Sequence, residues 1–485
     1  MRSLLALCVL LLSTGCLSTP RHSSPTQSSN AASPDFDARF TGSTLRVDYA
    51  HCGTSQQEAI ALVGYRAEGE WAGSRTQLVD RSDTGKYRFR MFDKASGSEL
   101  YSRGFASIYG EWETTAAAKQ GWGSFQECQR FPEPRASVFL ALEKRAADGR
   151  FAEFWRTELD PQSRFVDRSP IPALGEVIAL RENGPSAKQV DLLIVADGYT
   201  AQQRDKFVAD AKRLSDILLA TQPFARHAQR FSVRCLFVPT PESGISNPRK
   251  NIWKDSAFGL SFNAFDSDRY VLTYEDQTLR NAAAQAPYDA LILLFNERKY
   301  GGGGIYNLWA TVASDTEPAP YVFVHEFGHS FAGLADEYYS SQVAYEEFNP
   351  AGVEPWEPNA TALLDPKNLK WKDLVDSTTP IPTPWNQTLY DQVDLAYQKQ
   401  RAEAIAQQAS EERNEELMRE IKAQTAVLLA TEPHRGKVGA FQGSMYEAKG
   451  LYRPEVDCIM FSRNPTNFCK VCERALERTI LMYTE

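Results

Sequence analysis

The chain has 485 residues, enough for two or three folded units at roughly 150 residues each. Hydrophobic residues make up 42% and charged residues 24%, which excludes a collagen-like, coiled-coil or wholly disordered protein. The net charge is −9, and affinity for nucleic acid depends on Lys and Arg that neutralise phosphates. We therefore expect no nucleic-acid partner.

The first 16 residues are typical of an export signal. Met1 and Arg2 precede an apolar run over residues 4–12, which is shorter than the ~20 residues needed to span a bilayer. Residues 12–16, Leu-Ser-Thr-Gly-Cys, resemble the lipobox of bacterial lipoproteins, in which the Cys carries the lipid. We expect Cys16 to anchor the protein to the bacterial cell envelope, at the outer membrane or the cell surface. A cleaved signal and a secreted protein are the alternative.

Residues 17–35 are predicted to be a flexible tether. They are rich in Ser and Pro, and residues 18–34 contain no aromatic residue and no Leu, Ile or Val. Such a segment cannot bury a hydrophobic core. The folded part of the protein should therefore begin near residue 36.

The cysteine content agrees with export. Without the two cysteines of the signal, six remain: Cys52, Cys128, Cys235, Cys458, Cys469 and Cys472. An even number in an oxidising compartment favours disulfides, and we expect Cys52 to pair with Cys128 and two of the last three cysteines to pair together. A second, structural zinc on the last three is less favoured, because they number only three and no His is close in the sequence.

Residues 36–168 are predicted to form an N-terminal β-sandwich. Residues 45–49, 87–92 and 137–142 alternate or run in short apolar stretches typical of strands, and glycine-containing turns lie near residues 85 and 97. His51 is the one histidine of this region and has no ligand-type partner near it in the sequence. We expect no catalytic group here.

Residues 169–485 are predicted to form an α/β catalytic domain, so that the whole chain is an α+β multidomain protein. Residues 190–196 read as a buried strand, and further apolar runs cover residues 231–238, 290–295 and 309–313. Residues 391–429 are rich in Ala and Glu and lack Gly and Pro, which predicts a helical insertion. We interpret the charges of this insertion as a solvated face.

The sequence His325-Glu326-Phe327-Gly328-His329 predicts a zinc site. Residues four apart project from the same face of a helix, so both imidazoles can bind one Zn²⁺. Glu326 lies beside that face and can accept a proton from a zinc-bound water. His325 and His329 are therefore candidate ligands, and Glu326 is the candidate catalytic base.

A catalytic zinc needs a third protein ligand and one open position. Gly333 can end the helix with a positive φ and turn the chain back toward the metal. The pattern resembles the metzincins, in which a His or Asp three residues after such a glycine is the third ligand. Asp336 is the preferred candidate, with Glu337 or a distant Glu as alternatives.

Together with its neighbours, this motif resembles the IgA peptidase family of zinc metalloendopeptidases. The resemblance rests on residues 196–200, 301–307, 333–338, 452–454 and 458–460, and on residues 71–74, 101–105 and 111–112 near the N-terminus. It implies a metzincin-like catalytic domain preceded by the family's accessory domain. It also implies that Met460 forms a methionine turn beneath the metal.

The residues predict a peptidase that hydrolyses extracellular or host polypeptides, glycoproteins among them. We expect one Zn²⁺ to activate water, Glu326 to move the proton, and Tyr452 or Tyr338 to contact the oxyanion. Gly302 and Gly303 offer bare backbone that a substrate could approach. The alternatives are a surface lipoprotein that binds glycan or protein through a non-catalytic zinc site, and a zinc amidase that acts on cell-wall peptides.

Overall fold

The computed structural model describes residues 35–340, 349–407, 409–465 and 467–485. The predicted export signal with Cys16, and the tether up to residue 34, lie outside the described residues. No helix within the described ranges is both long and apolar enough to cross a bilayer.

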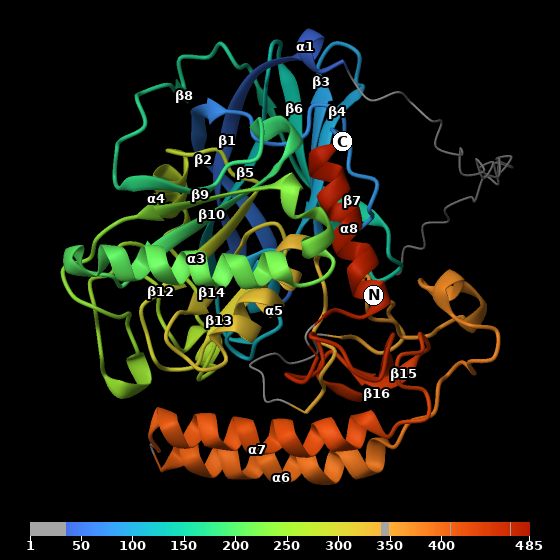
Figure 1. Cartoon of the computed structure of the whole chain (residues 1–485). Helices are drawn as coiled ribbons and strands as arrows, with labels where there is room; N and C mark the ends of the chain where they lie inside the picture. Colours follow the sequence, from blue (N-terminus) through green and yellow to red (C-terminus); the bar gives the residue numbers. More distant parts are fainter. Residues whose placement is uncertain (1–34, 341–348, 408, 466) are drawn as a thin grey trace, which may run out of the picture.

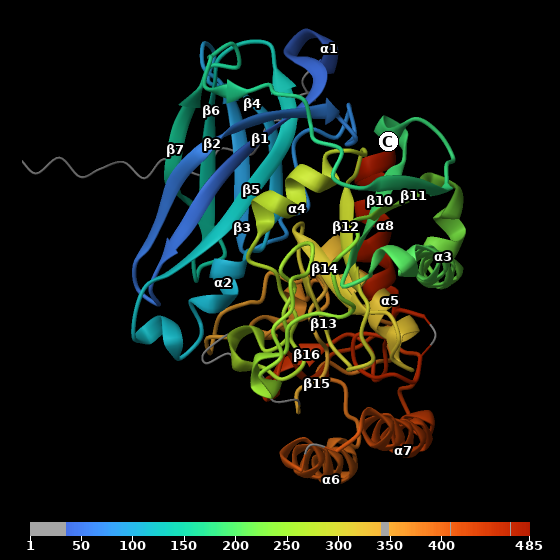
Figure 2. The same ribbon diagram turned by 90° about the vertical axis from the view of Figure 1, so that its left-hand side faces the viewer.

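The N-terminal part consists of two four-stranded sheets that share a core. One sheet has the order β5-β1-β2-β8 and the other β4-β3-β6-β7, and the predicted strands at residues 45–49, 87–92 and 137–142 belong to β1, β3 and β6. The strands of both sheets lie together in the upper part of Figure 2. Inward side chains such as Val47, Phe89, Phe131 and Leu140 form the common core. The elements are α1 (Phe36–Arg39), β1 (Phe40–Gly53), β2 (Glu58–Glu70), β3 (Tyr87–Asp93), β4 (Glu99–Phe105), α2 (Ile108–Trp112), β5 (Gly123–Pro134), β6 (Val138–Arg145), β7 (Phe151–Leu159) and β8 (Val166–Asp167).

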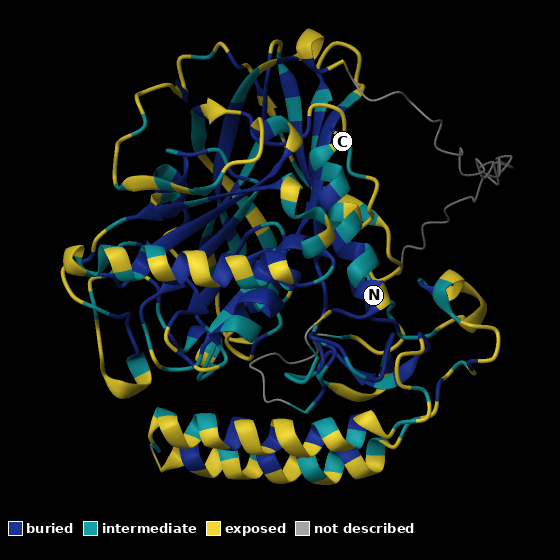
Figure 3. Ribbon diagram, viewed as in Figure 1, coloured by how far each residue is buried: buried dark blue, intermediate teal, exposed yellow. Residues whose placement is uncertain are grey.

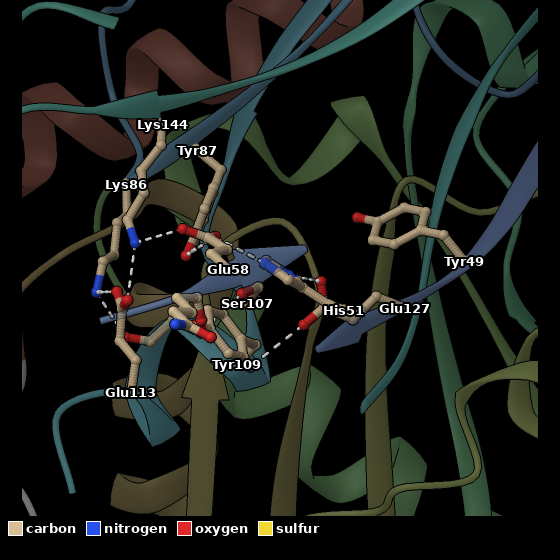
Figure 4. Close-up of polar contacts among 12 residues, drawn as sticks. Tyr49, His51, Glu58, Lys86, Tyr87, Ser107, Tyr109, Glu113, Glu127 and Lys144 are labelled. Atoms are coloured by element: carbon tan, nitrogen blue, oxygen red, sulfur yellow. Dashed lines mark hydrogen bonds and ion pairs between the residues drawn. The ribbon is translucent and has the colours of Figure 1, made fainter. Parts of the chain in front are cut away.

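His51 does have partners, contrary to the expectation from sequence. Its Nδ1 lies 2.8 Å from Glu127 and its Nε2 lies 2.8 Å from Glu58, and the imidazole is 1% exposed (Figure 4). Glu58 also accepts hydrogen bonds from Tyr87 and Lys144. The partners come from β2 and β5, which flank β1 in the sheet, so only strand pairing brings them to His51.

The C-terminal part is built on a six-stranded sheet with the order β13-β14-β12-β10-β11-β9. The four central strands are parallel, and the two edge strands, β13 and β9, run antiparallel to their neighbours. β10 is buried on both faces, as the apolar run of residues 192–196 predicts. The strands are β9 (Glu176–Arg181), β10 (Val190–Asp197), β11 (Phe231–Phe237), β12 (Ala290–Phe295), β13 (Gly302–Ile305) and β14 (Trp309–Ala313).

Different elements cover the two faces of this sheet. Helices α3 (Arg204–Ala220), α5 (Ala319–Ala332) and α8 (Lys470–Thr484) share one core with one face (Figure 1). The other face packs against α4 (Asp276–Ala283) and against α2 and β5 of the N-terminal part. Because the N-terminal part contributes to this second core, it is fixed relative to the six-stranded sheet.

The predicted insertion is a pair of helices, α6 (Gln387–Ala406) and α7 (Glu411–Ala430), which pack side by side. Figures 1 and 2 show the pair lying beneath the body of the protein, near the small sheet of β15 (Phe441–Ser444) and β16 (Glu447–Arg453). Figure 3 shows buried and exposed residues alternating along both helices. Each helix therefore has an inward face as well as the solvated one that the sequence predicts.

The structure contains none of the predicted disulfides among the described cysteines. Cys52 lies opposite Ser124 on β5, whereas Cys128 lies opposite Asp48, so the sheet register separates the proposed pair. Cys458, Cys469 and Cys472 are close together but their sulfurs are not bonded. Both expected bridges are therefore absent.

Candidate active site

Helix α5 carries the two predicted histidines. It begins at Ala319, directly after Pro318, and buries Phe323, Phe327 and Phe331 in the core of the C-terminal part. It ends at Gly333, which has φ 63° and ψ 32°, the left-handed conformation that the sequence predicts. This turn reverses the chain and returns it toward the histidines.

The reversed chain brings Asp336 to the two imidazoles. His325 Nε2 lies 3.1 Å from His329 Nε2 and 2.9 Å from Asp336 Oδ1, and His329 Nε2 lies 3.2 Å from the same Oδ1. Bonds of 2.0–2.1 Å to a tetrahedral zinc place neighbouring ligand atoms ~3.3 Å apart. The three atoms thus fit three corners of a zinc tetrahedron in both distance and donor type.

Backbone carbonyls orient both imidazoles. His325 Nδ1 lies 3.1 Å from the carbonyl oxygen of Ile459, and His329 Nδ1 lies 2.5 Å from that of Leu334. A proton on each Nδ1 leaves each Nε2 as a lone-pair donor for a metal. The Tyr321 hydroxyl donates to the same Ile459 oxygen at 2.9 Å.

Charge among these residues favours cation binding. Burial by itself would raise the pKa of Asp336, but His329 and His325 hold that pKa well below its ordinary value. Burial would lower the pKa of His329, but Asp336 raises it to about 9. The aspartate is therefore an anion that attracts positive charge, whether as protons on imidazole or as a metal.

Glu326 lines the cavity in front of the histidines. Within the described part of the chain, no hydrogen bond or ion pair holds its carboxylate. Burial raises the pKa of Glu326, while His325 and His329 oppose that rise. A half-buried, unpaired carboxylate with a raised pKa is suited to accept a proton.

Glu337, the alternative third ligand, points away from the histidines. Its Oε1 accepts hydrogen bonds from Asn359 at 3.0 Å and from the Cys472 thiol at 3.2 Å. Its backbone N–H donates to the carbonyl of Met460 at 2.8 Å. The geometry therefore favours Asp336 over Glu337 as the third ligand.

Met460 lies underneath helix α5, where the family resemblance places it. It is fully buried, and a Cβ added to Gly328 would lie 3.2 Å from its sulfur. Its neighbour Ile459 supplies the carbonyl that orients His325. The segment therefore supports the site through packing and one hydrogen bond.

The two predicted tyrosines have different positions. Tyr338 lines the cavity, its ring stacks over His325 with centroids 6.2 Å apart, and its hydroxyl accepts a hydrogen bond from Arg269 at 3.3 Å. Tyr452 lies on β16, where its backbone pairs with Thr361, and it does not line the cavity. The prediction for Tyr452 is therefore wrong, because the short sheet directs it elsewhere.

Tyr446, which sequence reasoning missed, contacts the site directly. Its hydroxyl donates to Asp336 Oδ2. Met445 and Tyr446 form the two-residue turn between β15 and β16, with φ of 51° and 67°. Such a turn normally uses Asn-Gly, so the pair Met-Tyr gives no turn signal in the sequence. Positive φ at bulky residues is strained, and strain of this kind is concentrated at functional sites.

The glycine-rich strand β13 lies against α5. A Cβ on Gly304 would lie 2.5 Å from the backbone oxygen of Glu326 and 2.9 Å from His329 Cβ, so glycine is required for this close approach. Gly302 already pairs with the chain at Arg269 and Val271, which corrects the expectation of a free rim there.

Gly303 faces β14 in the ladder. The alternation along the strand turns the backbone groups of Gly304 outward, toward the cavity. Of these glycines, Gly304 is therefore the one whose backbone is best placed to meet a substrate.

The cavity encloses about 210 Å³, far more than the ~10–15 Å³ that one water needs. One wall is formed by the inward face of α6 and α7, which the sequence interpretation treated as solvated. Arg269, Arg401 and Arg463 also line it, and none of the three is in an ion pair with another described residue. The arrangement can therefore receive an anionic group beside the histidines.

Comparison with known families decides the identity. The family model described as IgA Peptidase M64 matches residues 178–480, and the model of the Peptidase M64 N-terminus matches residues 35–156. The chain belongs to the IgA peptidase M64 family. The resemblance identified from the sequence is thereby confirmed, and no curated protein matches the chain.

Membership of the M64 family makes this protein a metallopeptidase with a polypeptide substrate. Such an enzyme needs a metal, and two groups of described residues offer ligand sets: His325, His329 and Asp336, and a second set around Glu337. The first set borders the cavity and has three ligands, which leaves room for water. It is therefore the candidate catalytic centre of this M64 peptidase.

Proposed function

We propose that this M64 peptidase is a zinc-dependent endopeptidase in which Glu326 is the general base. The observation that carries the proposal is the meeting of His325 Nε2, His329 Nε2 and Asp336 Oδ1 beside the cavity that Glu326 lines. A catalytic zinc has three protein ligands and an open position. The glycine turn and the buried methionine beneath the helix support a metzincin-like arrangement.

When bound, zinc would supply a Lewis acid that polarises the scissile carbonyl and lowers the pKa of water toward ~7. Glu326 is placed to accept a proton from a water in the cavity and to return it to the leaving amine. Tyr338, whose hydroxyl accepts a hydrogen bond from Arg269, is placed to donate its own proton to the oxyanion, whereas the Tyr446 hydroxyl donates to Asp336. The outward backbone groups of Gly304 orient the substrate as an added strand.

The test is Glu326→Gln in the full chain. We expect the variant to keep its zinc and to lose peptide cleavage by a factor of ~10²–10⁴, because the base is gone while the ligands remain. Glu317→Gln, on an exposed carboxylate just before α5, is the matched control and should cleave normally. Cleavage by Glu326→Gln at the wild-type rate would remove this mechanism.

The charge of the cavity supports a substrate with a carboxylate near the scissile bond. Arg401 belongs to α6, and the guanidinium groups of Arg269 and Arg463 donate hydrogen bonds to the hydroxyls of Tyr338 and Tyr300. Asp394 is the acidic residue of α6 that faces this region. A peptide library should show that Asp or Glu is preferred over Asn or Gln at one position, and Arg401→Gln should reduce that preference.

Two other functions predict different results. A lipoprotein that only binds glycan or protein would hold metal but cleave nothing, and a cell-wall amidase would cleave peptidoglycan peptides and not folded proteins. Profiling of glycoproteins, peptide libraries and peptidoglycan separates the three. The unpaired Glu326 beside three metal ligands favours hydrolysis over binding alone.

The proposed location is the bacterial cell envelope or the extracellular space. The support is the N-terminal sequence, with its apolar run and Cys16. Cys16→Ser should release the protein from the membrane fraction if the lipid is attached there. An unchanged membrane fraction would refute the anchor.

A further inference from the structure

A second cluster of potential metal ligands lies behind the catalytic centre. Glu337, Cys458, Cys469 and Cys472 are all buried, and one ligand atom from each lies within 4.8 Å of the others. Glu337 is 0% exposed and Cys472 is 0% exposed. The mechanism proposed above uses none of these residues.

The distances match a tetrahedral thiolate site. The sulfurs of Cys458 and Cys472 lie 3.9 Å apart, and the Cys472 sulfur lies 3.2 Å from Glu337 Oε1. Zinc bonds of 2.3 Å to sulfur and ~2.0 Å to oxygen place neighbouring ligand atoms ~3.8 Å and ~3.5 Å apart, respectively. Three thiolates and a carboxylate thus supply four corners and close the site to water.

The surroundings favour a cation. The second carboxylate oxygen of Glu337, Oε2, is buried without a hydrogen-bond partner among the described residues. Arg453 is a buried positive group whose charge acts on Glu337, but its Nη atoms are bonded to the backbone carbonyls of Gln442, Gly443 and Val456. Burying an uncompensated carboxylate beside three sulfurs is costly. A divalent metal would remove that cost.

The local backbone also favours thiolates. Cys469 is the N-cap of α8 and Cys472 lies in its first turn, where the helix dipole stabilises negative charge. The backbone N–H of Cys469 donates to the Cys458 sulfur at 3.3 Å, and that of Cys472 donates to the Cys469 sulfur at 3.5 Å. Deprotonated sulfur is the form that binds zinc.

We propose that Glu337, Cys458, Cys469 and Cys472 bind a second, structural Zn²⁺. Soft thiolates in a tetrahedral arrangement select zinc over magnesium or calcium. The ion would join three segments: the loop that carries Asp336, the segment that carries Met460, and the start of α8. It would hold the third catalytic ligand in place without contacting substrate.

Metal content tests the proposal in the full chain, purified without added metal. We expect two zinc ions per wild-type chain by elemental mass spectrometry. His325→Ala combined with His329→Ala should retain one, and Cys472→Ser should lose the structural ion. Cys235→Ser, at a buried cysteine outside the cluster, is the control and should retain both.

Two measurements keep the test decisive if Cys472→Ser fails to fold. Protein unfolded with a chelator and without reductant should alkylate at all three C-terminal cysteines. Cobalt in the double-histidine variant should give a thiolate-to-metal charge-transfer band. The proposal would be overturned if the wild type held one zinc and the double-histidine variant held none. A disulfide among these cysteines would also overturn it. Neither measurement uses peptide cleavage. Failure of the structural-zinc proposal can therefore be distinguished from failure of the proposed function.

Discussion

Replacing His51 by Gln should destabilise the N-terminal part in a pH-dependent way. Burial by itself lowers the pKa of His51, but Glu127 and Glu58 raise it from 6.5 to about 9. At ~1.4 kcal/mol per pH unit, this increase corresponds to roughly 3 kcal/mol of stability. Removal of one partner from a buried ion pair independently predicts ~3–5 kcal/mol. The two estimates agree in size.

The sign follows from the direction of the pKa change. Since the folded pKa is the higher one, the contribution of His51 is fully present below pH 6.5 and is lost as the pH rises through about 9. The pKa of Glu58, for which burial is outweighed by His51 and Lys144, falls to about 2. Its contribution is present above pH 4.5 and is lost as the pH falls toward 2.

Urea unfolding of wild type and His51→Gln at pH 6 and pH 9.5 measures the effect. The difference in unfolding free energy should be roughly 3 kcal/mol at pH 6 and should shrink by most of that amount at pH 9.5. His227→Gln, at a histidine whose side chain is 20% exposed, is the control. The reasoning would be refuted if His51→Gln lowered the unfolding free energy at pH 6 by no more than the ~1 kcal/mol of an exposed pair. An equal loss at both pH values would refute it as well.

Three further predictions concern the catalytic centre. Tyr446→Phe removes the hydroxyl that donates to Asp336, so zinc affinity or kcat/KM should fall ~10–100-fold; unchanged values would show that this contact is unimportant. Gly304→Ala should lower both Tm and activity because its Cβ would meet α5 at 2.5 Å, whereas Gly121→Ala, with nothing within 4 Å, should behave as wild type in the same melts. Met460→Ala should cost ~2–5 kcal/mol and Met460→Leu less than ~1.5 kcal/mol in urea unfolding; equal costs would argue against tight packing there.

Short-range patterns predicted the geometry of helix α5 well. His325 and His329 share a face because the helical period is 3.6 residues, and the structure places their Nε2 atoms 3.1 Å apart. Gly333 has the positive φ that its position suggested. These features depend on a few consecutive residues, so the sequence contains the information directly.

Other features could not be predicted because they join distant parts of the chain. The adjacent residues Asp336 and Glu337 face different clusters, and only the packing of the loop against Met460 separates them. Tyr446 reaches Asp336 from a strained turn that has no sequence signal. The helical insertion contributes Arg401 to the cavity because it folds back over the site.

The sequence by itself thus determined the fold class, the family, the two helical histidines with their glutamate, and the turn that follows them. The tertiary structure decided the choice of Asp336, the tyrosine that contacts it and the partners of His51. It also brought Glu337 to the three C-terminal cysteines. The physical reason is the distance along the sequence over which each feature is determined. Helical periodicity and glycine conformation are local properties, whereas the pairing of buried charges and ligands depends on which distant segments the core brings together.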